Sequence, residues 1–483
     1  MRPLSRRSAL LLGGLGLAGT VTGGTGLALT LASQRSVPTA GADLQYPSVL
    51  RSSDGSLNVQ LEAGGTTLLL AGRQASALAY NKEIPGPTLR IRPGDVLKIR
   101  LINNLSEPTN LHMHGLHVSP QGNGDNPFIR VDPGTAVDYE YRLPRDHPPG
   151  VYWYHPHHHG GVADQVFAGL YGAIIVEDPE ATNAGLERIL LVSDTTLDPL
   201  GDIHPASPME RMLGREGELL LVNGQLNPQL TAPPGDTERW RVINACASRY
   251  LRLRLDGQHV RLIGTDSGRL PLPVDTDELF LAPGNRADIL VETVTGESVL
   301  LAAPYDRGSV RGMAGPGGAA GVPPAAATPV ALLRVSGARK TSGTAVPAAS
   351  EALDLRLSGV AAHRQLTFGT QMGMGMMGFT LNGKRFDPTR TDITASADTV
   401  EEWTLLNDSP MEHPFHLHIW PMQVTEVNDR MVKGVRLQDV VNVPANGRVK
   451  VRVSFADFTG RSVYHCHILD HEDLGMMGVI EVR

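Results

Sequence analysis

The sequence predicts an all-β protein built from three Greek-key β-sandwiches in one chain. Its 483 residues are too many for one ordinary domain and suit about three. The chain contains 53 Gly and 35 Pro but only 5% aromatic residues, a composition typical of short strands joined by tight turns. A third observation is a motif that recurs every ~140 to ~165 residues, which indicates repeated domains.

The repeated motif begins with a turn and continues as an alternating strand that ends at Asn. Its three copies are Pro93–Asn103, Pro234–Asn244 and Ala397–Asn407. A second turn follows in each copy, and these turns are Asp132-Pro133-Gly134, Ala282-Pro283-Gly284 and Val443-Pro444-Ala445. Equivalent turns before equivalent strands predict one Greek-key sandwich per copy.

Two composition changes set the expected domain limits. The first copy ends near Asp178-Pro179, and an Ala/Pro/Gly-rich tract from Gly312 to Ser350 separates the second copy from the third. We therefore expect domains at residues 43–178, 179–345 and 346–483.

Residues 1–42 are predicted to form an export signal of the twin-arginine type. Ser5-Arg6-Arg7 precedes an uncharged, apolar and Gly-rich run from Ser8 to Ser33. A membrane anchor is the alternative, but the Gly content and the absence of later apolar spans favour a signal. We expect a protein exported to the periplasm, cell envelope or exterior, without stable membrane insertion after processing.

Charge and cysteine content narrow the class of partner and the redox chemistry. The net charge of -7 comes without a basic stripe, which argues against nucleic acid as a partner. Of the two cysteines, Cys466 stands between two His in a metal-site pattern, so no disulfide is expected. Cys246 follows a predicted strand and is interpreted as a small buried apolar residue.

The first and third copies share a set of histidine pairs that the second copy lacks. Superposing the two copies aligns four histidines of the first copy with four of the third: His112 with His416, His114 with His418, His155 with His465, and His157 with His467. The eight residues form four His-x-His pairs, two in each copy. Residues i and i+2 of a strand share a face, so each His-x-His pair can direct both imidazoles at one metal cluster. Four ligands from each of two equivalent domains predict a cluster at their interface, with the second copy as a metal-free spacer.

The third copy alone carries a second kind of metal site. His413 and Cys466 replace Thr109 and Pro156 of the first copy, and His471 and Met476 follow Cys466 by five and ten residues. Strand parity sends Cys466 to the face opposite His465 and His467. Two imidazoles, a thiolate and a weak thioether are typical of a blue-copper electron-transfer site, with structural zinc as the alternative.

These motifs resemble those of the multicopper oxidase family from about Tyr80 to the C-terminus. The pattern is most similar to bacterial three-domain laccases and copper-efflux oxidases. The resemblance implies cupredoxin-type sandwiches and four copper ions. It assigns His413, Cys466, His471 and Met476 to the type 1 copper, and His112 and His416 to the type 2 copper. The two type 3 coppers would take His114, His155 and His467, and His157, His418 and His465.

The resemblance also implies a reaction. A laccase-like oxidase couples one-electron oxidation of phenolic or aromatic donors to the four-electron reduction of dioxygen to water. Glu472 resembles the glutamate that delivers protons in the family, and Asp125 resembles the acid that orients water at the type 2 copper. An exposed loop carboxylate is the alternative for Asp125. His117, His158 and His159 exceed the ligand pattern and are interpreted as solvated or supporting residues.

The sequence leaves the electron donor open between phenols and metal ions. We expect a monomer whose partners are this donor and dioxygen. Thioethers favour Cu(I), so a Met-Gly tract suggests a metallo-oxidase that confers copper tolerance by oxidising Cu(I), or an oxidase of Fe(II). Flexible Met packing is the alternative. The candidate donor contacts are Met372, Met374, Met376, Met377 and Met411. Outside this class, the alternatives are an envelope scaffold without copper and a two-domain copper nitrite reductase.

Overall fold

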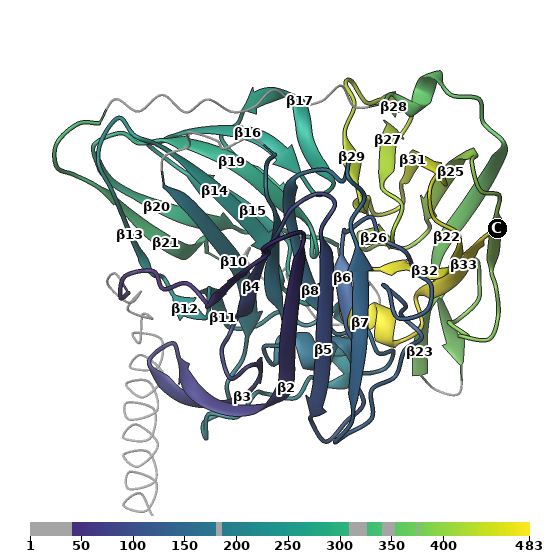
Figure 1. Cartoon of the computed structure of the whole chain (residues 1–483), viewed down its shortest axis with the longest axis horizontal. Helices are drawn as coiled ribbons and strands as arrows, with labels where there is room; N and C mark the ends of the chain where they lie inside the picture. The colour runs from purple at the N-terminus through teal and green to yellow at the C-terminus, as the bar shows by residue number, and fades with distance from the viewer. Residues whose placement is uncertain (1–40, 180–185, 309–325, 341–352, 374–375) are drawn as a thin grey trace, which may run out of the picture. The chain divides into compact units, whose positions relative to one another are not determined.

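The computed structural model describes residues 41–179, 186–308, 326–340, 353–373 and 376–483 (Figure 1). Strands dominate this part of the chain and confirm the predicted all-β class. The predicted export signal lies almost wholly outside the described residues. Within them, no helix is both long and apolar enough to cross a membrane.

The first sandwich consists of two facing sheets, ordered β1-β4-β9-β8-β6 and β3-β2-β5-β7. Apolar residues of both sheets form one buried core between them. Helix α2, Val162–Phe167, lies between β8 and β9. The strands are β1 Val49–Arg51, β2 Ser56–Leu70, β3 Arg73–Tyr80, β4 Gly86–Ile91, β5 Val96–Asn104, β6 His112–His114, β7 Ala136–Arg142, β8 Gly150–His155 and β9 Gly172–Val176.

The middle sandwich pairs the sheet β12-β11-β10-β14-β19-β16-β17 with the sheet β13-β21-β20-β15-β18. It has a buried core of its own and one short helix, α3, at Pro208–Leu213. The strands are β10 Glu187–Thr195, β11 Leu219–Val222, β12 Gln225–Leu226, β13 Gln229–Ala232, β14 Thr237–Asn244, β15 Leu251–Leu255, β16 His259–Thr265, β17 Gly268–Asp275, β18 Leu279–Leu281, β19 Arg286–Glu292, β20 Gly296–Ala303 and β21 Thr328–Val335.

The third sandwich pairs the sheet β23-β22-β25-β31-β27-β28, with β29 beside β27, with the sheet β24-β33-β32-β26-β30. Helix α4, Leu469–Asp473, precedes the last strand, and the 3-10 helix η1 is Leu355–Leu357. The strands are β22 Ala362–Gly373, β23 Met376–Leu381, β24 Ile393–Ala395, β25 Val400–Asn407, β26 His413–Leu417, β27 Met422–Val427, β28 Arg430–Met431, β29 Leu437–Gln438, β30 Val440–Val443, β31 Arg448–Ser454, β32 Gly460–Cys466 and β33 Met477–Val482.

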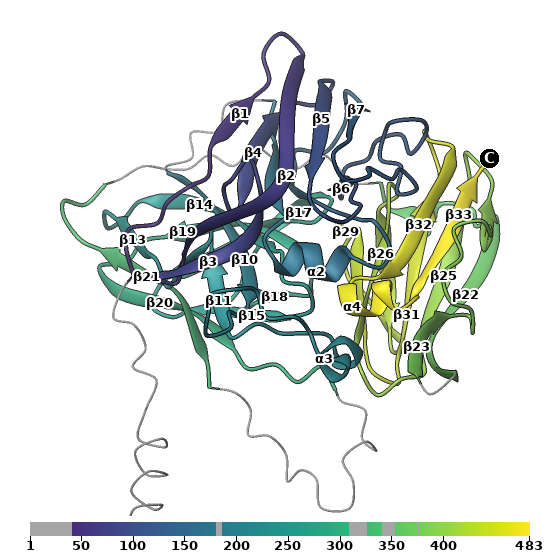
Figure 2. The same cartoon turned by 90° about the horizontal axis from the view of Figure 1, so that it is seen from below.

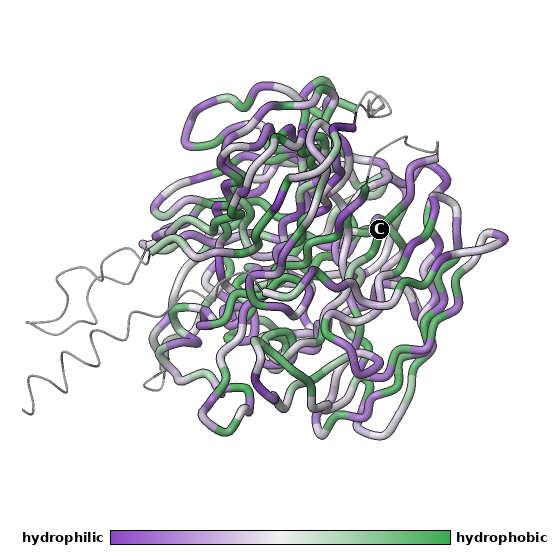
Figure 3. Tube along the Cα trace, turned by 90° about the vertical axis from the view of Figure 1, so that its left-hand side faces the viewer, coloured by the Kyte–Doolittle hydropathy of each residue, from purple (hydrophilic) through white to green (hydrophobic). Residues whose placement is uncertain are grey.

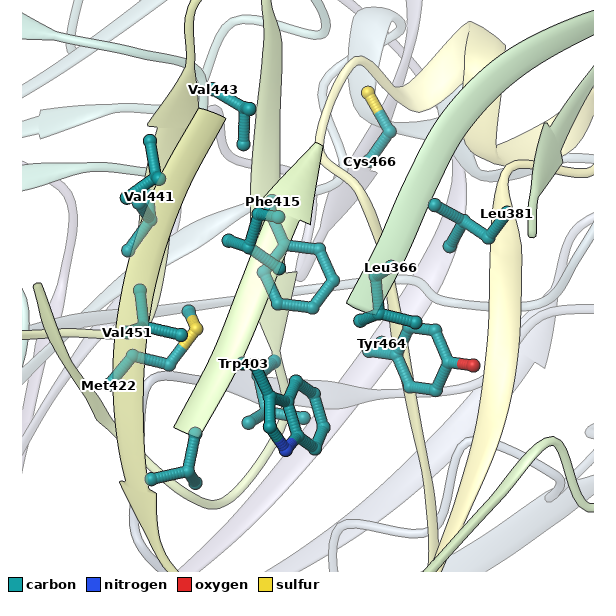
Figure 4. Packing of buried hydrophobic residues seen from close by; sticks show 14 of the residues in the cluster. Leu366, Leu381, Trp403, Phe415, Met422, Val441, Val443, Val451, Tyr464 and Cys466 are labelled. Atoms are coloured by element: carbon teal, nitrogen blue, oxygen red, sulfur yellow. The ribbon is translucent and has the colours of Figure 1, made fainter. Parts of the chain in front are cut away.

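Buried and more exposed residues alternate along β5 and β25. Figure 3 shows hydrophobic and hydrophilic residues interleaved along the chain. In the third sandwich, Trp403, Phe415 and Tyr464 fill the space between the sheets (Figure 4). Cys466 belongs to the same buried cluster and lies at one end of the residues drawn. A packed core at this point fixes the backbone from which the candidate metal ligands project.

The internal repeat reappears as repeated hydrogen bonds. Asn103, Asn244 and Asn407 each accept a bond from the backbone N–H two residues later, at 2.9, 3.1 and 3.0 Å. The side-chain amide of each also donates to backbone carbonyls that precede the second turn of its own copy. The Asn that ends each motif is therefore the residue that ties the strand to the following turn.

The structure corrects one detail of the repeat. The backbone bond that closes the second turn joins residues 132 and 135, 282 and 285, and 444 and 447. Asn446, with φ of 50°, therefore stands where Gly134 and Gly284 stand, and the third turn is shifted by one residue from the predicted alignment. Asn tolerates this left-handed conformation better than the Ala445 of the predicted alignment.

The Ala/Pro/Gly-rich tract from Gly312 to Ser350 is not a linker throughout. Strand β21 occupies residues 328–335 and pairs with both β20 and β13 of the middle sandwich. Its sequence, TPVALLRV, is a short apolar run bounded by small residues. Such a run is consistent with a strand, but the Ala-, Pro- and Gly-rich surroundings favoured a linker.

Candidate metal centres

Eight histidines converge between the first and third sandwiches, as the superposed copies predict. His112 is paired in register with His155 on neighbouring strands β6 and β8. His416 is paired with His465 in the same way on β26 and β32. All eight side chains are buried, with at most 2% exposed. The short helices that follow, α2 and α4, lie beside each other across this interface (Figure 2).

Strand parity explains only part of this convergence. His112 and His114 lie on β6, but β8, β26 and β32 end before the second His of their pairs. Hydrogen bonds place those later residues instead, because the His157 N–H donates to Asn110 Oδ1 at 2.6 Å and the His467 N–H to the Pro414 carbonyl at 2.6 Å. The prediction of two imidazoles on one side holds through loop geometry rather than through a continuous pleat.

One three-donor site lies at the middle of the cluster. The Nε2 atoms of His157, His418 and His465 are 3.0 to 3.2 Å apart. Ligands that each bond a first-row metal at about 2.0 Å with tetrahedral angles stand about 3.3 Å from one another. The triangle therefore fits one metal ion. The first sandwich supplies one of its three ligands, and the third supplies the other two.

The remaining cluster histidines form neighbouring donor groups. His112 Nε2 lies 3.4 Å from His416 Nε2, and His155 Nε2 lies 3.5 Å from His114 Nδ1. The ring of His467 lies 4.9 Å from that of His114, and neither His467 nitrogen has a hydrogen-bond partner among the described residues. A buried imidazole without partners is costly unless something binds it, which fits a metal ligand.

Hydrogen bonds select the nitrogen that each imidazole offers. Four of these side chains use Nδ1 in a bond to a carboxylate or a backbone carbonyl, which leaves the Nε2 lone pair free. They are His112 with Asp125, His155 with the Pro156 carbonyl, His416 with the Asp439 carbonyl and His465 with the Cys466 carbonyl.

Electrostatics keep the cluster imidazoles neutral. Burial, reinforced by neighbouring histidines, lowers the pKa of His112, His114 and His416 well below the ordinary value. Burial also lowers the pKa of His157 and His465 to about 4. Neutral imidazoles keep a lone pair for a metal at neutral pH, so the donor set is ready to bind copper.

A separate centre surrounds the single cysteine of the third sandwich. Cys466 Sγ lies 3.5 Å from His413 Nδ1 and 3.9 Å from His471 Nδ1, and all three residues are fully buried. His413 Nε2 bonds Ser409 Oγ at 2.8 Å, and His471 Nε2 donates to the Met212 carbonyl at 3.1 Å. Both Nδ1 atoms are thereby left facing the sulfur.

Met476 lies in the same buried core as Cys466. It is fully buried, and its carbonyl accepts the Cys466 backbone N–H at 3.0 Å. Burial raises the pKa of the Cys466 thiol well above its ordinary value, so a thiolate here requires a cation beside it. Thiolate, two imidazoles and a nearby thioether suit a copper ion that cycles by one electron.

The two predicted carboxylates lie against the histidine cluster, not in exposed loops. Asp125 Oδ1 and Oδ2 are each 3.0 Å from His112 Nδ1, and Glu472 Oε1 is 3.6 Å from His157 Nε2. Burial raises the pKa of each carboxyl to about 7. A backbone hydrogen bond from Met113 opposes the shift at Asp125, and the electrostatic interaction with His157 opposes it at Glu472. Both groups can therefore gain or lose a proton near neutral pH.

The extra histidines stay outside the donor groups of the described residues. His117 bonds the Ile419 carbonyl at 2.9 Å, His158 lies 3.4 Å from Arg130, and His159 packs against Phe386. Cys246 is a free, buried residue of the middle core.

The methionine candidates occupy two different environments. Met411 is 2% exposed, so it does not offer its thioether to solvent. Met372 and Met377 are paired in register across the β22–β23 hairpin, next to Met376. The side chains of Met372, Met376 and Met377, and all of Met374, lie outside what the structure describes.

Sequence reasoning missed three contributors to the cluster. Asp439 forms a potential donor group with His114 and His416. Arg286 of the middle sandwich bonds Asp439, and a Cβ on Gly284 would come within 3.1 Å of the His114 and His467 rings. No ligand spacing marks Asp439 or Arg286. The repeat marks Gly284 only as part of a turn, and Arg286 follows that Gly by two residues.

Three segments of the chain match multicopper oxidase family profiles: residues 63–181, 188–306 and 357–483. Among curated proteins, a multicopper oxidase of Staphylococcus haemolyticus is 31% identical, with 91% of this chain and 92% of that protein covered. A laccase of Bacillus subtilis is 28% identical over 83% of this chain and 89% of its own length.

Two further similarities bear on the alternatives. The cell division protein FtsP of Edwardsiella tarda is 30% identical, with 92% of this chain and 93% of that protein covered. Among solved structures, a multicopper oxidase of Campylobacter jejuni described as a metallo-oxidase superposes with a TM-score of 0.79 at 30% identity. That alignment covers 92% of this chain and 96% of the other chain.

Proposed function

The chain belongs to the multicopper oxidase family and is a laccase-like oxidoreductase with oxygen as acceptor; from that premise we propose how its residues divide the work. We propose that electrons are accepted one at a time at the Cys466 centre of the third sandwich. The first and third sandwiches would jointly hold a three-copper cluster, where bound copper would supply the chemistry that reduces dioxygen to water.

One observation carries this proposal. Cys466 Sγ faces His413 and His471, while the residues on either side of it, His465 and His467, belong to the histidine cluster. One peptide unit on each side of Cys466 thus joins the two centres covalently. A short covalent route favours electron transfer from one centre to the other.

The donor groups support the following assignment. A type 1 copper would be held by His413, Cys466, His471 and Met476, and a type 2 copper by His112 and His416. Two type 3 coppers would be held by His114, His155 and His467, and by His157, His418 and His465. Bound there, copper would supply one-electron transfer at the first centre and oxygen reduction at the cluster.

The two buried carboxyls supply what the reduction of dioxygen needs besides electrons. Four protons are consumed for each dioxygen, and a group with a pKa of about 7 can hand on a proton at neutral pH. We assign Glu472 to proton delivery because it lies beside His157 and His465 at the cluster. Asp125 orients His112 and the water that this site would use.

For the donor, we propose phenolic compounds first and Cu(I) as a second candidate. The second candidate rests on the Met-Gly tract at residues 372–377. Helix α3 adds support, because its Met212 carbonyl covers the outer nitrogen of His471 and its Met209 is 50% exposed. A phenol would have to displace that carbonyl to reach His471, whereas a metal ion could bind at the thioethers.

The first experiment measures stoichiometry. We expect the copper-loaded protein to consume about one dioxygen per four equivalents of dimethoxyphenol oxidised, with no hydrogen peroxide released. Accumulation of peroxide at about one dioxygen per two equivalents would contradict the three-copper assignment. Turnover with nitrite but not with dioxygen would support the nitrite reductase alternative instead.

The second experiment measures the donor. The ratio of kcat/KM for Cu(I) to that for dimethoxyphenol is compared between the wild type and a protein lacking residues 372–377. We expect a fall in the ratio if the Met tract receives Cu(I). An unchanged ratio would remove the tract from the donor site. The complete donor set argues against a copper-free scaffold role, and copper content checks this directly.

Organisation and location complete the proposal. We propose domains at residues 43–178, 179–345 and 346–483, because each pair of sheets has its own core. We also propose export by the twin-arginine route and a monomeric state. Fractionation of cells and sedimentation of the purified protein test these two points.

A further inference from the structure

Asp439 is a point at which the three sandwiches meet. Its buried carboxylate precedes β30 of the third sandwich and accepts a bond from His114 Nε2 of the first at 3.0 Å. Arg286 of the middle sandwich donates to both carboxylate oxygens, at 2.5 and 2.7 Å, and Ser267 Oγ donates at 3.2 Å. One side chain thus links elements of all three sandwiches.

His114 differs from four of the other cluster histidines in the nitrogen that this contact occupies. Four of them use Nδ1 in a hydrogen bond and leave Nε2 free. His114 instead gives its Nε2–H to Asp439, so its lone pair is on Nδ1, the atom 3.5 Å from His155 Nε2. A neutral imidazole carries one proton, so fixing the donor nitrogen also fixes the acceptor nitrogen.

The middle sandwich holds Asp439 firmly. Arg286 Nε donates to the Val151 carbonyl at 3.0 Å, and Asp266 lies 3.5 Å from its guanidinium. Gly115 has a φ of +86°, and a Cβ there would lie 2.3 Å from Arg286 and 2.7 Å from Asp439. The chain therefore keeps open the space that this ion pair needs, next to the His112–His114 strand.

We propose that Asp439 is a positioning residue that makes Nδ1 of His114 its copper-binding atom. Arg286 and Ser267 hold Asp439 in place, so the middle sandwich is a working part of the cluster rather than a spacer. This inference rests on the proposed copper cluster. The carboxylate–imidazole–metal arrangement is one in which loss of the outer partner lowers metal affinity by about 10- to 100-fold.

The first test reads the His114 tautomer in copper-free protein. Nitrogen NMR of histidine-labelled protein should show His114 protonated on Nε2 in the wild type. Asp439→Ala should change the proton position or produce a mixture of tautomers. An unchanged Nε2-protonated signal in this variant would overturn the proposal.

The second test measures copper retention against a competing chelator. Asp439→Asn should release cluster copper at about 10- to 100-fold lower chelator concentration, with the blue absorption of the Cys466 centre unchanged. The matched control is Asp178→Asn, which also removes a buried carboxylate paired with middle-sandwich arginines but touches no proposed ligand. Equal retention by the wild type and Asp439→Asn would contradict the inference.

Two outcomes separate failure of this inference from failure of the proposed function. If the wild type itself binds no cluster copper, the proposed function fails. If Asp439→Asn does not fold, Arg286→Lys decides, because Lys keeps the charge but loses the two-pronged contact. We expect intermediate retention for Arg286→Lys, and wild-type retention there would overturn the inference.

Discussion

The first and third sandwiches share one scaffold but differ at the four positions of the Cys466 centre. Tyr154 pairs with Gly172 in register as Tyr464 pairs with Gly478. The loop before each Gly is closed alike, because the Leu170 N–H donates to the Gln165 backbone carbonyl as the Met476 N–H donates to the His471 backbone carbonyl. Gln165 and Leu170 therefore occupy the positions of His471 and Met476.

The first sandwich fills these positions with groups that satisfy one another. The Thr109 hydroxyl donates to Gln165 Oε1 at 2.7 Å, and Gln165 Nε2 donates to the Pro108 carbonyl at 2.9 Å. In the third sandwich the same positions offer His413 and His471 nitrogens to a thiol. A candidate metal centre in the third sandwich and a closed polar pair in the first thus occupy equivalent buried positions.

The same comparison bears on the proposed site of proton delivery. Gly169 bonds the Val166 carbonyl as Gly475 bonds that of Glu472, so Val166 and Glu472 are equivalent. Only the third sandwich places a carboxyl there. The outer sandwiches share the histidine cluster, but electron uptake and proton delivery are both assigned to the third.

The largest expected effect follows from removing a first-sandwich donor. His157→Ala breaks the three-donor triangle with His418 and His465 and should abolish oxygen uptake, while the Cys466 centre can still be reduced and bleached by dimethoxyphenol. The matched control, His158→Ala, removes a ring outside the donor groups and should retain oxygen uptake. Normal turnover of His157→Ala would mean that the third sandwich works alone.

Removing the proton donor should have the next largest effect. In Glu472→Gln, reoxidation of the reduced enzyme by dioxygen should be about 100-fold slower, the range expected for loss of a general acid. Anaerobic reduction of the Cys466 centre should keep its rate. Stopped-flow single turnovers measure both steps, and reoxidation at the wild-type rate would exclude Glu472 as the proton source.

The same variant has a pH signature in copper-free protein. The folded pKa of Glu472 is about 7 against an ordinary 4.5, so the wild type loses stability as pH rises through that interval. Gln cannot ionise and avoids this loss. The stability difference should therefore shift in favour of Glu472→Gln between pH 4.5 and 7, by at most about 3 kcal/mol. Urea unfolding at several pH values measures it, and a pH-independent difference would contradict the raised pKa.

The smallest effect is expected from replacing Met476 of the third sandwich with the Leu found at the equivalent position of the first. Met476→Leu copies Leu170 and removes a weak thioether while keeping apolar volume. The blue absorption should persist, the reduction potential should rise and kcat should change by less than about tenfold. Redox titration checks this, and loss of the blue band would show that Met476 is an essential ligand.

The sequence predicted the histidine cluster because its determinants are local. His-x-His spacing and an internal repeat placed eight residues in register, and the difference at Cys466 separated the two centres. The roles of Asp439 and Arg286 were not predicted, because their contacts join different sandwiches and follow no spacing rule. The turn at Asn446 was misaligned by one residue, because the sequence alone does not show which residues the closing hydrogen bond joins.

The burial of Met411 and the cover of His471 by Met212 also depend on how sandwiches meet. A short sequence motif reports strand faces, but it does not report which loop of a neighbouring sandwich lies over them. Donor choice is therefore the part of the function that sequence reasoning resolved least.

The most direct test of the division between the sandwiches is copper content with visible absorption for Cys466→Ser beside Pro156→Ser. The two variants place the same residue at equivalent positions. We predict that Cys466→Ser loses the blue band and donor oxidation but keeps the cluster copper, whereas Pro156→Ser keeps all three. A blue band in Cys466→Ser, or its loss in Pro156→Ser, would contradict electron uptake at the third sandwich alone.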